Sequence, residues 1–285
     1  MSVIRNPNLG PSQMRMRRRR LFLIRSCIVL FFLLIIVLGL AIYSGHEKVK
    51  IQTILVSGNA AVSSDAILAT ANQVMSGRYY YLFAKNNYLI FPRWEIQERL
   101  LEEFKTIKEV DISWENWQII SIKITERRPH SIWCGADIKA VEQKCYFVDK
   151  EGYIYGLAGI FSGSMFVKNY CPILSNQLQN ISQINPLGSY FLSKNIYIQI
   201  YDLIQILDQR GLKVTTVSFD GADFKFKLDT GPEIIFNNKR AFELSFQNLF
   251  SAIETENLNL EKDASLINYI DLRFDNKIVV GKKEI

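Results

Sequence analysis

The sequence is poor in the side chains that most metal and catalytic sites require. It contains two histidines, His46 and His130, and none of its four cysteines belongs to a C-x-x-C pair. Zinc sites are assembled from Cys and His ligands, usually at short spacings along the chain. We therefore expect no metal ion and no cofactor in this protein.

Sequence motifs typical of enzymes are also missing. The chain has no G-x-S-x-G nucleophile elbow, no P-loop, no G-x-G-x-x-G fingerprint and no H-E-x-x-H pair. We therefore predict a protein that is not an enzyme. A membrane-anchored hydrolase of cell-wall polysaccharide is an alternative. Its two catalytic carboxylates would be paired by the fold and not by sequence spacing, and the chain holds 28 Asp and Glu residues.

Acidic residues are absent before His46, where seven arginines occur. Removing these seven from the total of 34 Lys and Arg leaves 27, against 28 Asp and Glu in the rest of the chain. The formal net charge of +6 therefore belongs to the N-terminal tail. Domains that bind nucleic acid carry their positive charge on a folded surface, so no nucleic-acid partner is expected.

The longest apolar run follows this basic tail. Residues 21–43 read LFLIRSCIVLFFLLIIVLGLAIY, with Arg25 as the single charge. About 20 apolar residues in a helix cross a hydrocarbon core of ~30 Å, so we predict a transmembrane helix at 21–43. The positive-inside rule places residues 1–20 in the cytoplasm and the bulk of the chain in the periplasm or outside the cell. A cleaved signal peptide is the alternative, but its apolar region is typically only ~7–15 residues long.

The pattern of residues 48–129 predicts a small mixed domain. A strand at KIQTILVSGN is followed by two amphipathic helices, the first with Ser63 or Ser64 as its N-cap and the second beginning near Pro92. Two alternating segments, VDISW and IISIKITERRP, then predict two strands. The order β-α-α-β-β favours two helices packed on one face of a three-stranded sheet.

Aromatic residues mark two places in this domain. In VDISW the side chains of Val110, Ile112 and Trp114 alternate with polar neighbours and share one face of the strand. The stretch RYYYLF at 78–83 lies between the two predicted helices. We interpret its tyrosines as a partly buried rim, with a second contact surface as the alternative.

Residues 130–280 predict a β-rich mixed domain with two flanking helices, followed by a polar tail at 281–285. The helices are SKNIYIQIYDLIQILDQRG and KRAFELSFQNLFSAIE, and the last two strands are INYIDLRF and KIVV. The predicted fold class of the whole chain is therefore α+β, with a single N-terminal transmembrane helix before two mixed domains.

Three cysteines fall in this second domain. Cys134 and Cys145 flank a short polar loop that a disulfide would close. Unlinked thiols are nevertheless the favoured interpretation, because Cys171 makes the number odd for a disulfide framework, and the Cys134–Cys145 disulfide is the alternative.

A charged junction, Glu126-Arg127-Arg128-Pro129, separates the two predicted domains. Side chains alternate along a strand, so Glu126 shares the face of Ile124 and points toward the buried side. Burying a lone carboxylate is unfavourable, and Glu126 is therefore expected to pair with Arg127 or Arg128. We interpret the junction as a structural seam, with a solvated run of charges as the alternative.

Several short motifs occur in an order that resembles one known family. They are V-x-G-N at 56–59, I-x-E-R-x-P at 124–129, FVDKEGYIY at 147–155 and YIDLRFDNKIVV at 269–280. Together with the basic tail and the apolar anchor, they resemble the bitopic cell-division proteins of the FtsQ/DivIB family. The resemblance spans nearly the whole chain after the tail and is weakest around residues 156–190.

The resemblance implies a polypeptide-transport-associated (POTRA) domain at 48–129 and a non-catalytic scaffold of the divisome, anchored in the inner (cytoplasmic) membrane at the septum. The implied partners are small bitopic coiled-coil proteins of the FtsB/DivIC and FtsL type. Directly or through them, the scaffold would influence the septal peptidoglycan synthase of the FtsW/FtsI type. Binding in this family adds a partner strand to the last strands of the β domain.

The last strand is also expected to form a binding edge on physical grounds. Ile278-Val279-Val280 is short and terminal, with nothing downstream to pair its outer edge, and sheets seldom leave such an edge unused. The expected partner-binding residues are Tyr269, Asp271, Arg273, Lys277, Ile278, Val279 and Val280. A POTRA-bearing transport component is a further alternative, but it would need a C-terminal membrane barrel for which this domain has too little chain.

Overall fold

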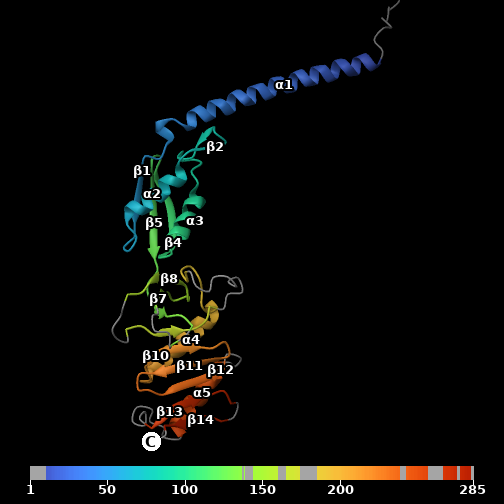
Figure 1. Cartoon of the computed structure of the whole chain (residues 1–285). Helices are drawn as coiled ribbons and strands as arrows, with labels where there is room; N and C mark the ends of the chain where they lie inside the picture. Colours follow the sequence, from blue (N-terminus) through green and yellow to red (C-terminus); the bar gives the residue numbers. More distant parts are fainter. Residues whose placement is uncertain are drawn as a thin grey trace, which may run out of the picture. The chain divides into compact units, whose positions relative to one another are not determined.

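A computed structural model describes residues 11–136, 138, 144–159, 165–173, 185–237, 242–255, 266–274 and 277–283. The chain divides into two compact units, Met1–Thr125 (unit 1) and Glu126–Ile285 (unit 2), and each is described by itself. Helices and strands are mixed in both units, and unit 2 contains a large sheet, in agreement with the predicted α+β class (Figure 1).

Helix α1 (Pro11–Ser44) contains the apolar run. Its segment Arg18–Ser44 is 27 residues long and contains an 18-residue window with a mean hydropathy of 3.0, so it is long and apolar enough to cross a membrane. At 1.5 Å per residue this segment measures about 40 Å, more than the ~30 Å of a hydrocarbon core. Residues 1–10 of the predicted basic tail lie outside the described residues.

The sheet of unit 1 has the strand order β1-β5-β4, with β1 (Thr53–Ser57) parallel to β5 (Ile119–Glu126) and β4 (Ile107–Asn116) beside β5. Helices α2 (Ser64–Met75) and α3 (Arg93–Glu103) pack against each other and on this sheet (Figure 1). The two-helix, three-strand arrangement expected from the sequence is therefore present.

Local signals explain the ends of these elements. The Ser63 hydroxyl accepts a hydrogen bond from the Ala66 amide at 3.3 Å, which caps α2 as its sequence predicts. Pro92 is the N-cap of α3 and not a residue of its first turn. The core of unit 1 is formed by one face of each element, with Ile67, Ala71, Ile96, Leu100, Ile107, Val110, Ile112, Ile120, Ile122 and Ile124 all buried.

Between the helices, β2 (Arg78–Tyr79) and β3 (Phe83–Ala84) form a small hairpin that the sequence analysis did not anticipate. Tyr80 and Tyr81 at its tip are exposed, so the interpretation of these two tyrosines as a partly buried rim was wrong. Trp114 is also exposed, although it continues the alternation of Val110 and Ile112. It stands near the end of β4, where Phe91 and Arg93, at the start of α3, lie against its ring.

Unit 2 is built on a nine-stranded sheet of order β14-β13-β12-β11-β10-β9-β6-β7-β8. The strands are β6 (Ser131–Trp133), β7 (Tyr146–Val148), β8 (Ile154–Leu157), β9 (Lys168–Tyr170), β10 (Val214–Phe219), β11 (Asp223–Leu228), β12 (Glu233–Asn237), β13 (Ile267–Asp271) and β14 (Val279–Lys282). Consecutive strands β10, β11 and β12 pair antiparallel, whereas β13 runs parallel to β12. The last pair, β13 and β14, is antiparallel and ends the sheet.

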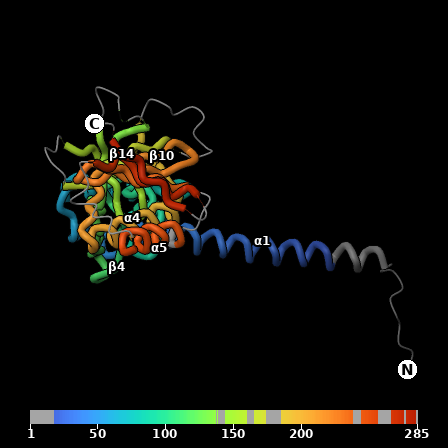
Figure 2. Tube along the Cα trace, turned by 90° about the horizontal axis from the view of Figure 1, so that it is seen from below, coloured from blue at the N-terminus to red at the C-terminus, as the bar shows by residue number. Residues whose placement is uncertain are grey.

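Two helices, α4 (Lys194–Gln209) and α5 (Phe242–Thr255), contact each other and share the core of unit 2 with the sheet. Figure 2 shows them side by side. Alternation along β11 explains which face they cover, because Phe224 and Phe226 are buried while Lys227 is exposed. The buried residues of α4 follow helical spacing and are Tyr197, Ile200, Leu203, Ile204 and Leu207.

Candidate functional site

Strand β14 forms an open edge of the large sheet. It pairs with β13 on one side and, among the described residues, with no strand on the other. The Lys283 amide donates to the Leu266 carbonyl at 2.8 Å, so Lys283 faces β13. Backbone groups of an antiparallel strand alternate between its two sides, which directs the N–H and C=O of Lys282 and Val280 to the open edge. This edge presents backbone hydrogen-bonding groups to any strand that approaches it.

Tyr269 of β13 lies against Gly281 of β14. The two residues are paired in the ladder, and a Cβ built on Gly281 would lie 2.3 Å from Tyr269 Cε1. Any side chain at position 281 would therefore displace the tyrosine ring. Glycine at this position allows the ring to cover the backbone of the edge strand.

The side chains expected to bind a partner occupy different environments. Ile278 and Val280 are partly buried against the core, and Val279 is partly exposed. Lys277 is exposed, with its Nζ 5.0 Å from the centroid of the Phe274 ring. The open edge is therefore apolar close to the sheet and positively charged where the chain enters β14.

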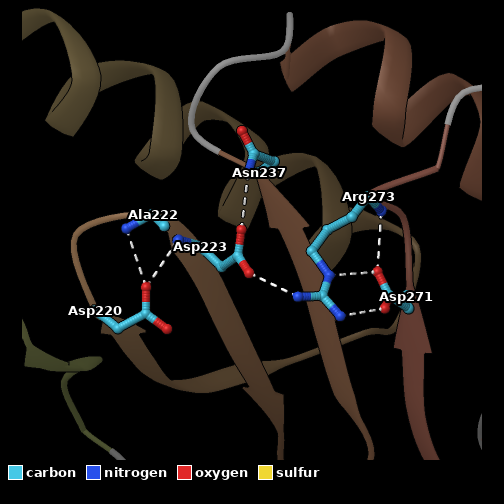
Figure 3. Close-up of polar contacts among 6 residues, drawn as sticks. All are labelled: Asp220, Ala222, Asp223, Asn237, Asp271 and Arg273. Carbon is cyan, nitrogen blue, oxygen red and sulfur yellow. Dashed lines mark hydrogen bonds and ion pairs between the residues drawn. The ribbon is translucent and has the colours of Figure 1, made fainter.

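Asp271 and Arg273 form an ion-pair network with Asp223 (Figure 3). Arg273 donates from Nε to Asp271 Oδ1 at 2.9 Å and from Nη2 to Asp271 Oδ2 at 2.6 Å. Its Nη1 donates to Asp223 Oδ2 at 2.7 Å, and Asn237 Nδ2 donates to the other Asp223 oxygen at 2.9 Å. The carboxylate of Asp271 is buried and bonded to Arg273, so it is not exposed for direct contact with a partner.

The electrostatics of this network keep its groups charged. Burial raises the pKa of Asp271, but hydrogen bonds and charge from Arg273 outweigh it, and the net shift is downward. The same contacts, with Asp271 first and Asp223 next, raise the pKa of Arg273. Backbone amides of Asp223 and Ala222 donate to Asp220 at the neighbouring turn and lower its pKa (Figure 3). The network joins the ends of β11, β12 and β13.

The junction Glu126-Arg127-Arg128-Pro129 provides the second group of candidate residues. Glu126 is half-buried at the end of β5, whereas Arg128 and Pro129 are exposed. Arg127 forms its ion pair with Asp149, an acid that the sequence analysis did not single out. This ion pair joins Arg127 to an acid 22 residues further along the chain, and the pairing of Glu126 with Arg127 or Arg128 stays a prediction.

Asp149 is held from several directions. One oxygen accepts from Arg127, while the other accepts from the amides of Glu151 at 2.8 Å and Tyr153 at 3.0 Å. The Arg127 guanidinium also lies 3.9 Å from the centroid of the Tyr153 ring. The sequence signal for this role of Asp149 was the turn in FVDKEGYIY, where Gly152 has a φ of +84°, a value that favours glycine.

Close to this ion pair, His130 belongs to a buried polar cluster. Its Nδ1 lies 3.1 Å from the Tyr197 hydroxyl, which in turn lies 2.9 Å from Ser131 Oγ. Asn169 Nδ2 donates to Ser131 Oγ at 3.1 Å. Burial, then the charge of Lys150, lower the pKa of His130 although Asp149 opposes them. Tyr197 stands between the histidine and the serine, so the pair is not arranged as a nucleophile and its base.

The structure joins Cys134 to Cys145 by a disulfide and leaves Cys171 as a buried thiol. Burial raises the pKa of the Cys171 thiol to about 12, which makes it unreactive near neutral pH. In the described part of the chain, no group of three or more His, Cys, Asp and Glu residues is arranged to hold a metal ion.

Comparisons with known proteins give no family assignment. The chain matches no protein-family model, and no curated protein matches it significantly in sequence.

Proposed function

We propose that this protein is a non-catalytic, membrane-anchored scaffold that captures a strand of a partner protein at the open edge of β14. The single observation that carries the proposal is that edge, where Val280 and Lys282 direct backbone groups toward a side on which no described strand pairs. Strand addition satisfies such groups and is a common mode of peptide recognition.

The rest of unit 2 supports this role. The Asp271–Arg273–Asp223 network and the contact of Tyr269 with Gly281 fix β13 and β14 before a partner arrives. A preorganised edge binds more tightly because less conformational entropy is lost on association. Among the expected contact residues, Lys277 and Val279 are placed for direct contact, whereas Asp271 and Arg273 position the edge.

The partner class comes from the resemblance to the FtsQ/DivIB family. On this proposal α1 anchors the chain in the cytoplasmic membrane with its N-terminus inside, and unit 1 carries a POTRA-type domain. The partners are small bitopic coiled-coil proteins of the FtsB/DivIC and FtsL type at the division septum. Through them the scaffold is linked to the peptidoglycan synthase of the FtsW/FtsI type.

A proline at Lys282 tests the backbone contact. Lys282 is exposed and its N–H is directed outward, so Lys282→Pro removes a donor for an added strand without removing a bond to β13. Lys282→Ala is the matched control, because it removes the charge and keeps the N–H. We expect Lys282→Pro to lower co-purification of the FtsB/DivIC-type protein by about tenfold or more, a loss of ~1.4 kcal/mol or more in binding. Lys282→Ala should retain most of the binding.

Photo-crosslinking separates edge capture from general association. A photoreactive residue at Lys277 should crosslink to a small bitopic membrane protein, whereas one at Leu157 should not. Leu157 is exposed at the end of β8, which is the opposite edge strand of the same sheet. Equal crosslinking at both positions, or equal binding by the two Lys282 variants, would reject strand capture at β14.

A further inference from the structure

Unit 1 exposes a group of large aromatic and apolar side chains that its core does not use. We call it the aromatic surface. Its members and their exposed fractions are Tyr80 (89%), Tyr81 (94%), Leu89 (71%), Trp94 (81%), Trp114 (54%) and Trp117 (67%). Three of the four tryptophans of the chain belong to it. Large apolar patches on soluble surfaces are uncommon and mark binding sites.

The last turn of α1 is attached to this part of unit 1. Ser44 Oγ accepts a hydrogen bond from the Ala84 amide at 3.2 Å, and Asn87 Nδ2 donates to the Ser44 carbonyl at 3.1 Å. Ser44, Ala84 and Asn87 are all buried. The end of the apolar helix and the hairpin β2–β3 are therefore fixed to each other.

The tryptophans are connected to the same place. After α1, the Val49 carbonyl accepts from the Tyr88 amide at 3.0 Å, and the Tyr88 ring lies 4.8 Å from that of Trp117. The Tyr88 carbonyl accepts from Trp114 Nε1 at 3.3 Å. Trp114 and Trp94 line one hollow of about 490 Å³. Tyr79 of the hairpin and Leu89, which follows it in the chain, line the same hollow.

We propose that the aromatic surface lies in the headgroup region of the bilayer that α1 crosses. This inference rests on the proposed anchoring by α1 and adds a second membrane contact to it. Tyr81 is three residues from Ala84, so its backbone is within about 11 Å of Ala84, whose amide is bonded to Ser44 at the end of α1. Each headgroup layer is ~5–8 Å thick, and tyrosine or tryptophan side chains extend several ångströms further, which brings the two within reach.

The chemistry of the side chains identifies lipid as the occupant. Tryptophan and tyrosine concentrate at membrane–water interfaces because each ring joins a large apolar area to one polar group. Charge plays a smaller part, since two of the nearby cations are already paired with acids. Lys85 lies 3.6 Å from Glu95 and Arg93 lies 3.2 Å from Asp111. Binding is therefore expected in zwitterionic lipid without anionic headgroups.

The hairpin tip provides a second observation. Leu82 N donates to the Tyr79 carbonyl at 2.9 Å, and Tyr80 and Tyr81 have φ values of +49° and +63°. Asparagine and glycine are preferred in such a turn because bulky residues are strained there. Because Tyr80 and Tyr81 occupy these positions, both rings project from the tip of the hairpin. On this proposal they contact the lipid headgroups.

Tryptophan quenching by brominated lipid tests the inference on the full chain in phosphatidylcholine vesicles. The variant Trp133→Phe keeps the three tryptophans of the aromatic surface. The matched variant Trp94→Phe/Trp114→Phe/Trp117→Phe keeps only Trp133, which is buried in unit 2. With bromine near the carbonyl end of the acyl chains, we expect at least about twofold more quenching in the first variant. If Trp133→Phe does not fold, the unaltered chain replaces it.

The outcomes separate this inference from the anchor itself. A chain that fails to float with the vesicles would overturn the anchoring role of α1. A chain that floats, but whose three tryptophans are quenched by acrylamide from the water and not by brominated lipid, would overturn the membrane contact. That second result would leave the aromatic surface free for a protein partner.

Discussion

Arg273 and Asp223 are 50 residues apart in sequence, yet Nη1 of the arginine lies 2.7 Å from Oδ2 of the aspartate. The contact reaches from the end of β13 across β12 to the start of β11. Because Arg273 also binds the buried Asp271, its side chain ties β13 to β11, and Asn237 of β12 joins the same network through Asp223.

Replacing this arginine should weaken unit 2 and its edge. Arg273→Met leaves the buried carboxylate of Asp271 without its side-chain donor, so we expect a loss of about 1–2 kcal/mol in the free energy of unfolding. The value is modest because the Arg273 side chain is 41% exposed. Urea unfolding of the full chain measures it, with Lys277→Met as the control. An equal effect of the two substitutions would mean that the network adds no stability.

The ion pair between Arg127 and Asp149 is less exposed and should matter more. Their side chains are 12% and 5% exposed, and Arg127→Met would leave the buried carboxylate of Asp149 without its cationic partner. We expect destabilisation by about 3 kcal/mol, near the lower limit for a broken buried pair because two backbone amides still bind Asp149. The neighbouring Arg128 is exposed, so Arg128→Met should change stability by less than ~0.5 kcal/mol. Thermal unfolding of both variants tests the contrast, which similar melting temperatures would contradict.

His130 should make the stability of unit 2 sensitive to pH. Its pKa in the folded chain lies below the ordinary value of 6.5, so the unfolded chain binds the proton more readily. Stability from the neutral ring is therefore fully present above about pH 6.5 and is lost as the pH falls toward the folded pKa.

The variant His130→Asn keeps a polar group near Tyr197 and cannot titrate, so its melting temperature should change less between pH 7 and 5 than that of the unaltered chain (a range around the ordinary histidine value of about 6.5). The variant His46→Asn, in unit 1, should leave the pH dependence of unit 2 unaltered. If the melting temperature of His130→Asn fell as steeply between pH 7 and 5 as that of the unaltered chain, the pH dependence would belong to groups other than His130.

The hairpin tip should gain stability from the residues that its turn prefers. Tyr80→Asn with Tyr81→Gly removes the strain of two positive φ angles, and we expect about 1 kcal/mol of stabilisation in unit 1. Hydrogen exchange of unit 1 amides in the full chain measures this, with Tyr88→Phe as an aromatic control away from the turn. Faster exchange in the Asn-Gly variant would show that contacts of the tyrosine rings stabilise unit 1 by more than the backbone strain of the turn destabilises it.

Much of the local structure follows from the sequence because short-range rules decide it. The apolar run at 21–43 predicts a membrane-length helix, Ser63 predicts the start of α2, and alternation in FKFKL predicts which residues of β11 are buried. In each case the spacing of side chains along one element is sufficient. The suggestion of an edge strand at Ile278-Val279-Val280 arose in the same way, and its role in binding stays a prediction.

Contacts between distant segments were decided by the tertiary structure alone. Alternation placed Trp114 with the core residues Val110 and Ile112, but the fold leaves its side chain 54% exposed, with its ring beside Arg93 at the start of α3. The ion pair between Arg127 and Asp149 was likewise not visible in the sequence, because the fold brings together two residues that lie 22 positions apart.

The sequence by itself determined an apolar anchor, the identity of most helices and strands, and which faces of them are apolar. These depend on periodicity within about 20 residues. Only the tertiary structure decided that Arg273 reaches across β12 to Asp223, that Ser44 binds Ala84, and that Trp114 and Trp117 both contact Tyr88. The physical reason is that these relationships join residues 26 or more positions apart, as Trp114 is from Tyr88 and Arg273 is from Asp223. No local propensity encodes such pairs.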